Sequence, residues 1–146
     1  MASTVPTPFL PVALIVDSDA DSAEMYAVAL SLEGFTTVEA HDASQAVDWL
    51  VENRPTVVVT ELCLSGASDG LALIRRLREN EHSRDIPVVV VTANASMRAR
   101  EAARRQGCDV FLAKPCLPED LTRHVHALVS QRNACLQVPT LIRGSS

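Results

Sequence analysis

Two kinds of apolar pattern alternate along the chain. Five short runs of mostly apolar or β-branched residues are separated by segments in which apolar residues recur every three or four positions. Unbroken runs of this length are typical of buried strands, and the wider spacing is typical of one buried helix face. The pattern predicts strands at residues 12–16, 36–39, 56–60, 87–92 and 109–113. The inward helix faces are predicted at Ala23, Tyr26, Ala27 and Leu30, at Ala46, Trp49 and Leu50, at Leu71, Ile74 and Leu77, within residues 97–106, and at Leu121, Val125 and Leu128.

Residues with special capping or backbone properties mark the ends of these helices. Gly34 follows the first helix, where a residue free to adopt positive φ can end it. Asp42 and Gln45 resemble a capping box ahead of the second helix. Ser96 precedes the fourth helix as an N-cap, and Pro118 opens the last one, where its missing N–H removes no hydrogen bond.

The order of these elements predicts the fold class. Strands that are apolar at every position have both faces covered, which is the result of right-handed parallel βαβ crossovers. We therefore expect an α/β fold with a five-stranded parallel sheet, doubly wound as (βα)5. A length of 146 residues fits one domain, which we place at residues 11–132, after a flexible leader (1–10) and before an aperiodic tail (133–146).

Composition and charge exclude several classes of function. The net charge of −5 argues against a nucleic-acid partner,. The first apolar run lacks a preceding positive charge and is too short to span a bilayer, which predicts a cytoplasmic protein without a membrane partner. The four cysteines have no C-x-x-C spacing, and they and the histidines form no recognisable metal motif. Of the 13 basic residues, 12 are arginines and one is Lys114.

The residues that follow the predicted strands are the candidates for function. In an open parallel sheet, ligands bind beyond the carboxyl ends of the strands. Acidic, hydroxyl and ammonium groups converge there, because the strand ends carry Asp17, Ser18, Asp19, Glu61, Thr92, Ala93, Asn94, Lys114 and Pro115. Lys114 is of special interest, since a chain that otherwise uses arginine keeps a compact ammonium there.

From about Pro11 to Arg132, the chain resembles the receiver domain of two-component response regulators. The resemblance is carried by the acidic turn after the first strand, by Asp69-Gly70 at a helix start, by Thr92-Ala93, by Phe111 at the family's switch position and by Lys114-Pro115. It implies a flavodoxin-like three-layer sandwich. It also implies Mg²⁺-dependent phosphoryl transfer to an aspartate after the third strand, with two adjacent acids holding the metal.

The sequence departs from the family at that site. Glu61 stands at the acceptor position, Ser18 replaces the second acid, and Ser65 replaces a proline in a loop one residue longer. The extra methylene of Glu61 displaces its carboxylate, and a displacement of about 1 Å can cost roughly a hundredfold in rate. Asp17 and Glu61 remain as candidate metal ligands, and we expect Mg²⁺ binding to be weak or absent.

The other pocket residues admit more than one interpretation. We expect Lys114 to pair with Glu61. The Thr92 hydroxyl either bonds Glu61 or belongs to an ordinary β-branched strand end, and Phe111 is either a switch aromatic or a core residue. Glu61 is either a degenerate, solvated carboxylate or a stand-in for phosphoaspartate.

The predicted fourth helix is strongly basic. Met97, Arg98, Arg100, Arg104 and Arg105 form either a solvated face or a partner surface, which would suit an acidic partner,. In receivers this region commonly contacts the output protein or a second copy.

These observations favour an atypical receiver that works as a phosphorylation-independent protein-interaction module and not as an enzyme. Its partner would be a sensor kinase, an output protein or a second copy of the chain. A conventional or displaced acceptor, such as Asp17 or Asp19, is the main alternative. Asp17-Ser18-Asp19 also resembles the D-x-D motif of haloacid-dehalogenase-like phosphatases, but Asp21 and the absence of a later acidic pair at a strand end weaken that reading.

Overall fold

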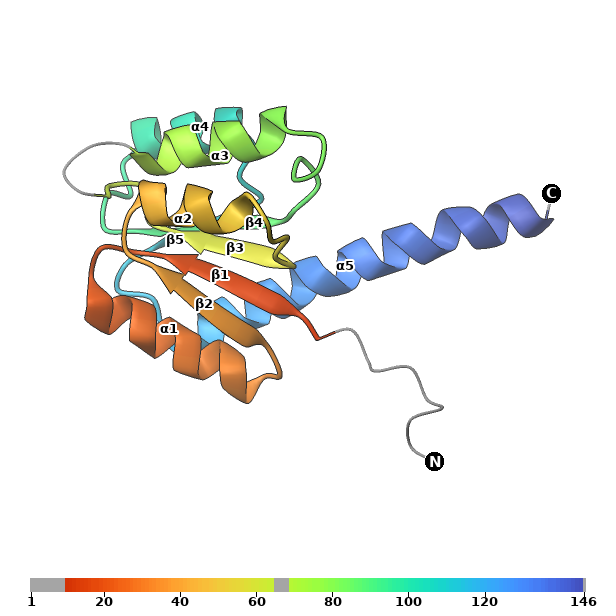
Figure 1. Cartoon of the computed structure of the whole chain (residues 1–146), viewed down its shortest axis with the longest axis horizontal. Helices are drawn as coiled ribbons and strands as arrows, with labels where there is room; N and C mark the ends of the chain where they lie inside the picture. Colours follow the sequence, from red (N-terminus) through yellow and green to blue (C-terminus); the bar gives the residue numbers. More distant parts are fainter. Residues whose placement is uncertain (1–9, 65–68, 146) are drawn as a thin grey trace.

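Strands and helices alternate along the described chain (Figure 1). The computed structural model describes residues 10–64 and 69–145, with side chains up to Arg132. Its strands are β1 (Val12–Val16), β2 (Thr36–Ala40), β3 (Val57–Thr60), β4 (Val88–Thr92) and β5 (Val110–Ala113). Its helices are α1 (Ala20–Leu32), α2 (Ala43–Leu50), α3 (Asp69–Glu79), α4 (Met97–Gln106) and α5 (Pro118–Ser145). Each strand and helix predicted from the sequence is present.

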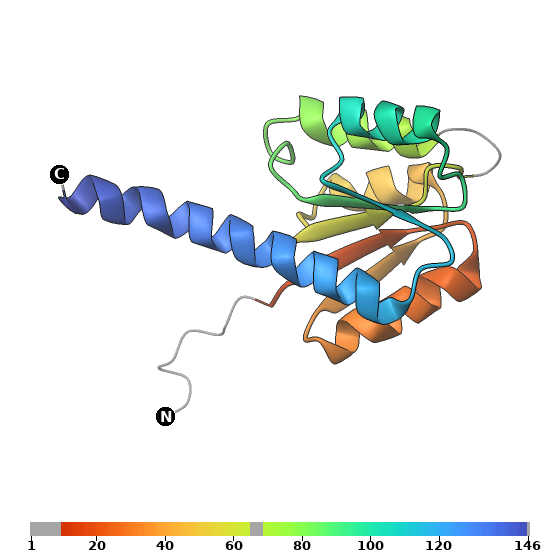
Figure 2. The same cartoon turned by 180° about the vertical axis from the view of Figure 1, so that it is seen from behind.

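The strands form a parallel sheet in the order β2-β1-β3-β4-β5. Helices α1 and α5 cover one face, and α2, α3 and α4 cover the other (Figures 1 and 2). This is the doubly wound, flavodoxin-like three-layer sandwich that the sequence predicted. Because the chain crosses from β1 outward to β2 and then returns to β3, the loops after β1 and β3 diverge and leave a crevice between them.

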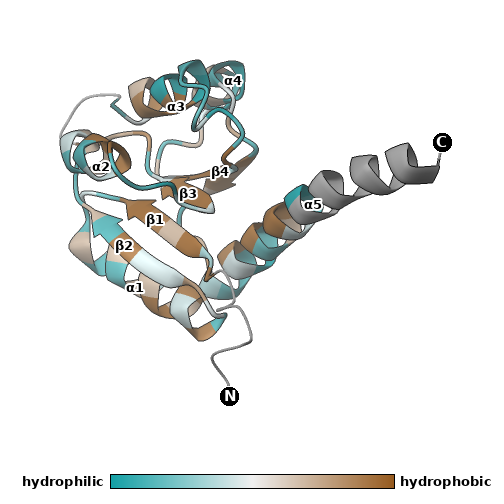
Figure 3. Cartoon of the chain, turned by 45° about the vertical axis from the view of Figure 1, so that its right-hand side comes forward, coloured by the Kyte–Doolittle hydropathy of each residue, from teal (hydrophilic) through white to brown (hydrophobic). Residues whose placement is uncertain are grey.

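Apolar side chains from both faces of the sheet form the core. Along β1, Leu14 and Val16 pack towards α2 and α3, while Ala13 and Ile15 pack towards α1 and α5. The residues of β3 and β4 are buried throughout, which explains why those strands are apolar at consecutive positions,. Figure 3 shows the hydrophobic strands β1, β3 and β4 between the two helix layers.

The predicted helix boundaries have the expected physical basis. The N-terminal caps are Asp42, which accepts the Gln45 backbone N–H at 2.7 Å, and Ser96, which accepts that of Ala99 at 3.1 Å. Gly34, just beyond α1, has φ of +101°, a conformation that favours glycine,. All four residues predicted for the inward face of α1 are buried.

The last helix differs from the expectation. The periodic apolar pattern stops near residue 132, and an aperiodic tail was predicted beyond it, but α5 continues to Ser145. It extends well beyond the sheet in Figures 1 and 2. Apolar periodicity reports which residues pack against a core, so it gives no signal for a helix that runs past that core. Residues 1–9 of the predicted leader lie outside the described residues.

No helix in the described part of the chain is both long enough and apolar enough to cross a membrane.

Candidate functional site

The sheet itself positions three charged residues at its carboxyl edge. The ladder of backbone hydrogen bonds continues one residue past the strands: Asp17 N–H donates to Ala40 O at 3.0 Å, and Glu61 N–H donates to Val16 O at 2.9 Å. Lys114 N–H donates to Thr92 O at 2.8 Å. Continued pairing fixes the three backbones relative to one another, so their side chains converge beyond β1, β3 and β5.

The Asp17 carboxylate is almost fully buried, with 3% of the residue exposed. Its Oδ1 accepts the backbone N–H of Asp19 at 2.9 Å, and its Oδ2 accepts a hydrogen bond from Lys114 Nζ at 2.9 Å. Both oxygens therefore have partners from the protein, as a buried carboxylate requires.

The Glu61 carboxylate is also buried and is held by backbone donors. Its Oε1 accepts the N–H of Leu62 at 2.7 Å and that of Cys63 at 3.4 Å. Its Oε2 accepts the Ala93 N–H at 3.3 Å and lies 3.3 Å from Lys114 Nζ. The side chain is thus folded back onto its own loop and the β4 end, and it is not a solvated carboxylate.

The Lys114 ammonium lies between these two carboxylates. The ion pair with Glu61 that the sequence predicted is present, but the shorter contact is to Asp17, which sequence reasoning missed. Burial opposes the charged amine, yet the hydrogen bonds and charges of Asp17 and Glu61 outweigh it, so the pKa of Lys114 is raised above 10.5,. The amine is protonated throughout the physiological range.

The other two residues of the acidic turn face solvent. Ser18 and Asp19 are exposed, and Asp19 serves as the N-cap of α1. Its carboxylate accepts a hydrogen bond from Ser22 Oγ at 2.7 Å and from Asp21 N–H at 3.3 Å. The Ser22 hydroxyl is the main reason that the pKa of Asp19 is lowered.

Thr92 does not bond Glu61. Its buried hydroxyl accepts the Asn94 N–H at 3.0 Å, and the neighbouring Ala93 supplies a backbone donor to Glu61 instead. Of the two interpretations of Thr92, the structure favours the strand end. Pro115 follows Lys114 through a cis peptide bond and is exposed.

Phe111 is partly buried on β5, against the core, and Arg100 covers it. The guanidinium carbon of Arg100 lies 4.7 Å from the centre of the Phe111 ring, within the range of a cation–π contact,. Arg100 is exposed, as both interpretations of this helix require, and its guanidinium also contacts the Phe111 ring.

Two further residues at this edge make contacts that sequence reasoning missed. A Cβ on Gly70 would lie 2.3 Å from Glu61 O, so α3 can approach the end of β3 this closely because residue 70 is glycine. His41 Nδ1 lies 3.2 Å from Asp17 O, which brings the β2–α2 loop against the site. Neither contact has a periodic signature, since both join residues distant in sequence.

A family model described as the response regulator receiver domain matches residues 13–126. This chain belongs to the response regulator receiver family. The chain is 34% identical over 116 residues to the phosphate regulon transcriptional regulatory protein PhoB of Pseudomonas aeruginosa, covering 80% of this chain and 50% of that protein. It is 32% identical over 124 residues to the transcriptional regulatory protein PrrA of Mycobacterium tuberculosis, covering 85% and 52%. The chain thus spans about half the length of these curated relatives.

Solved receiver structures have the same fold. A putative response regulator from Chloroflexus aurantiacus has a TM-score of 0.78 at 27% identity, covering 84% of this chain and 99% of that one. The signal receiver domain of a signal transduction histidine kinase from Syntrophus aciditrophicus has a TM-score of 0.76 at 29% identity, covering 83% and 91%. Receiver domains are modules of two-component signalling, and this chain is one of them.

The donor set of this receiver does not fit the Mg²⁺ site that the family implies. Mg²⁺ needs octahedral oxygen ligands, but one oxygen each of Asp17 and Glu61 is bonded to the Lys114 ammonium and the others accept backbone N–H groups. The Asp19 carboxylate caps α1, and position 18 offers only a hydroxyl. Among the side chains described, those of residues 10–64 and 69–132, no three acidic, histidine or cysteine side chains form a group able to hold a metal.

The basic residues predicted as a partner surface lie on α4. Met97 is 76% exposed, and Arg98, Arg104 and Arg105 face solvent. The nearest acid, Glu101, lies 3.9 Å from Arg105 in an exposed pair, and such pairs contribute little. Most of the positive charge on α4 is therefore available to another molecule.

Proposed function

We propose that this receiver acts in two-component signalling by binding a protein partner, and that its binding does not depend on phosphorylation of Glu61. The observation that carries the proposal is the Lys114 ammonium bridging the buried carboxylates of Asp17 and Glu61, at 2.9 Å and 3.3 Å. In the receiver pattern, Glu61 stands at the acceptor position. The pocket then contains its own anion, already paired with a cation.

The chemistry of the pocket disfavours phosphoryl transfer. An attacking carboxylate oxygen must be available, yet both oxygens of Glu61 accept hydrogen bonds from the protein. No adjacent pair of acids is present to hold Mg²⁺ next to it, because Ser18 follows Asp17. Both the hydrogen-bonded Glu61 carboxylate and the missing second acid therefore disfavour phosphoryl transfer.

Glu61 imitates phosphoaspartate only in part. A phosphoryl group carries about −1.5 to −2 charges and three strong acceptor oxygens, whereas Glu61 carries a single negative charge. A hydrogen bond to a charged group contributes roughly 1.5–3 kcal/mol, but reversing a 1:99 equilibrium needs about 5.5 kcal/mol. Glu61 therefore biases an already balanced equilibrium between receiver conformations and does not impose the active one.

We further propose α4 as the docking surface. Its exposed face carries Met97, Arg98, Arg104 and Arg105, which suits a partner with an acidic patch around an apolar residue,. A sensor kinase, an output protein or a second copy of the chain are the candidates for that partner, because these are the molecules that receivers contact.

Phosphorylation can be tested directly by intact mass. The chain is incubated with acetyl phosphate and Mg²⁺, alongside three variants: Glu61→Gln, Glu61→Asp, and the double variant Ser18→Asp/Glu61→Asp. We expect no phosphoryl adduct on the natural chain or on Glu61→Gln. The double variant should gain one phosphoryl group that hydroxylamine removes, because it restores both the shorter acceptor and the second acid.

The four samples separate the alternatives. A hydroxylamine-sensitive adduct on the natural chain overturns the proposal. An adduct that persists in Glu61→Gln identifies a displaced acceptor, such as Asp17 or Asp19, and overturns it as well. A labelled double variant beside an unlabelled natural chain supports the proposal and shows that the rest of the pocket is competent.

A further inference from the structure

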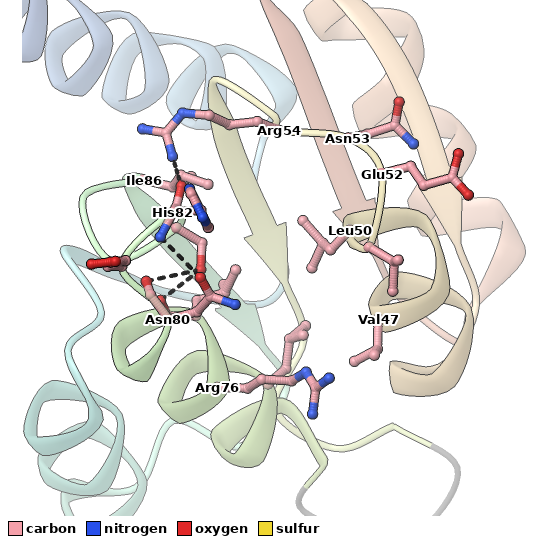
Figure 4. Close-up of a pocket in the computed structure, with 14 residues that line it drawn as sticks. Val47, Leu50, Glu52, Asn53, Arg54, Arg76, Asn80, His82 and Ile86 are labelled. Atoms are coloured by element: carbon pink, nitrogen blue, oxygen red, sulfur yellow. Dashed lines mark hydrogen bonds between the residues drawn. The ribbon is translucent and has the colours of Figure 1, made fainter.

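The charges of this chain are segregated along its sequence. Residues 1–53 contain no lysine or arginine, so all 13 basic residues lie from Arg54 onward. Figure 4 shows the boundary, where Glu52 follows α2 and Arg76 lies on α3. The first 53 residues nevertheless contain nine of the 18 acidic residues, namely Asp17, Asp19, Asp21, Glu24, Glu33, Glu39, Asp42, Asp48 and Glu52.

The fold converts this segregation into two differently charged sides of the molecule. The acidic elements α1 and α2 contact β1 and β2, at one edge of the sheet, whereas α4 connects β4 to β5, at the other. Helices α1 and α4 also lie on opposite faces of the sheet (Figures 1 and 2). Among the described side chains of α5, which lies beside α1, the two arginines are already paired: Arg123 with Asp120 at 2.8 Å and Arg132 with Asp109 at 3.8 Å.

The exposed face of α1 combines apolar and acidic side chains. Met25, Val28 and Leu32 are 41%, 52% and 80% exposed, and their spacing of three and four residues places them on one stripe of the helix,. Asp21 and Glu24 are exposed beside this stripe. All five side chains, which we call the α1 face, line a hollow of about 500 Å³. Apolar side chains gathered on a surface and rimmed by polar ones are typical of a protein-binding site.

The exposed face of α4 has the complementary composition. It consists of Met97, which is 76% exposed, and of the exposed Arg98, Arg104 and Arg105. Within the part of the chain that the structure describes, neither Arg98 nor Arg104 forms an ion pair. A methionine side chain is flexible and fills irregular apolar gaps, and guanidinium groups bind carboxylates. This α4 face thus offers an apolar side chain to the hollow on α1 and cations to the two acids beside it.

We propose that copies of the chain associate head to tail, with the α4 face of one copy on the α1 face of the next. The proposal rests on the proposed function in taking α4 as the docking surface, and it names the partner. Because α1 and α4 lie on opposite faces of the sheet, the two surfaces cannot meet within one molecule. Each assembly keeps a free α1 face and a free α4 face at its ends, so association continues beyond two copies unless it closes into a ring.

Sedimentation velocity of the full chain, at concentrations up to about 1 mM, tests for this association. The net charge of −5 repels the copies from one another, whereas the two faces attract locally,. At about 0.1 M salt the Debye length is about 10 Å, roughly the diameter of one helix, so the charges of the touching faces decide the outcome. We expect the sedimentation coefficient to rise with concentration there and to become constant at about 1 M salt, where the Debye length is about 3 Å.

Two variants each damage one face. Glu24→Arg reverses an acid of the α1 face, and the double variant Arg98→Gln/Arg104→Gln removes two cations from the α4 face. Each variant should raise the Kd for association about tenfold, because like charges across an interface repel and lost charge pairs no longer attract. The three residues are exposed on their helices, so both variants should fold.

Matched controls make the same changes of charge elsewhere. Asp48→Arg on α2 matches Glu24→Arg, and Arg75→Gln/Arg76→Gln on α3 matches the α4 double variant, since all these residues are exposed. Both controls should associate as the natural chain does. Equal effects of the controls and the face variants would show that net charge and not these two faces governs association, and would overturn the proposal.

An equimolar mixture of the two face variants tests the head-to-tail geometry. Each variant alone lacks a partner for its intact face, but in the mixture the intact α4 face of Glu24→Arg meets the intact α1 face of the α4 double variant. The mixture should therefore form dimers with the affinity of the natural chain and grow no further. A mixture that stays monomeric overturns the proposal.

Failure of this proposal and failure of the proposed function give different results. A natural chain that stays monomeric at the lower salt concentration overturns head-to-tail association, but it leaves α4 open to a different protein. A phosphoryl adduct on Glu61 overturns the proposed function, and it leaves these measurements unchanged because they contain no phosphodonor.

Discussion

The Lys114 ammonium is the single group that separates two buried carboxylates. Asp17, Glu61 and Lys114 have side-chain exposures of 5%, 7% and 18%, so water screens their interaction only weakly,. Two carboxylates at one strand edge repel each other, and the ammonium between them converts that repulsion into two attractions. The stability of the site therefore depends on Lys114 more than on either acid alone.

We predict that Lys114→Met lowers the free energy of unfolding by about 3 kcal/mol at pH 7, as expected when one partner of a buried ion pair is removed. Urea unfolding followed by the fluorescence of Trp49, the one tryptophan of the chain, measures this change. Arg98→Met is the control, because it removes an exposed cation and should change the free energy by less than about 0.5 kcal/mol. Equal effects of the two variants would contradict the prediction.

The pH dependence of this difference follows from the raised pKa of Lys114. A raised pKa means that the folded state holds the proton more tightly, so the contribution is complete below the ordinary value of 10.5 and is lost as the pH rises through the folded value,. The gap between the natural chain and Lys114→Met should thus be constant between pH 7 and 10 and shrink above pH 10.5.

At the scale of helices and strands, the sequence predicted most of the fold for a physical reason. Helix caps and buried helix faces depend on residues only a few positions apart in the sequence. Asp42, Ser96 and the buried face of α1 could therefore be predicted from spacing alone. The pairing of Lys114 with Glu61 followed from the edge of the sheet at which both strands end. The closer contact with Asp17 depends on rotamers and loop paths, which no sequence pattern encodes.

Arg78 makes a second kind of contact that no sequence pattern predicts, namely hydrogen bonds from one guanidinium to several distant segments. It is one of three arginines on α3, but its guanidinium alone joins several elements. Its Nε donates to Gly107 O at 3.0 Å, its Nη1 to Ile86 O at 2.8 Å, and its Nη2 to Asp109 Oδ2 at 3.0 Å. It therefore ties α3 to the loops before β4 and β5, at the edge of the sheet opposite Glu61.

We predict that Arg78→Lys destabilises the chain by about 2 kcal/mol, although it conserves the charge, since an ammonium cannot reproduce the planar fork that serves separate acceptors. Arg75→Lys is the matched control on the same helix and should change the free energy of unfolding by less than about 0.5 kcal/mol. Urea unfolding of both variants provides the comparison. If Arg75→Lys destabilises as strongly as Arg78→Lys, helix propensity and not the fork is responsible.

At the scale of the whole molecule, α5 has two parts with different surroundings. Its first part covers the sheet beside α1, with Leu121 and Val125 fully buried, and Arg132 lies 3.8 Å from Asp109, just before β5. Its second part extends beyond the sandwich (Figures 1 and 2). The match to the receiver family ends at residue 126, within the first part.

We predict that a chain ending after Arg132 keeps the free energy of unfolding of the full chain within about 0.5 kcal/mol, the range expected for changes remote from a core. The helix beyond that point extends past the sheet, so its loss should remove little of the surface buried on folding. Urea unfolding of the shortened chain tests this, and the slope of the transition should also be unchanged because it reports the surface exposed on unfolding.

A chain ending after Leu117 is the opposing control. It loses the two buried residues Leu121 and Val125, and a large buried aliphatic side chain contributes about 2–5 kcal/mol when truncated to alanine,. The loss of these two side chains alone, roughly 4–10 kcal/mol, is comparable with the 5–15 kcal/mol or so by which a typical domain is stable. This shorter chain should therefore fail to fold cooperatively. If the chain ending after Arg132 also fails, the projecting part of α5 belongs to the folding unit, and the boundary at residue 132 is wrong.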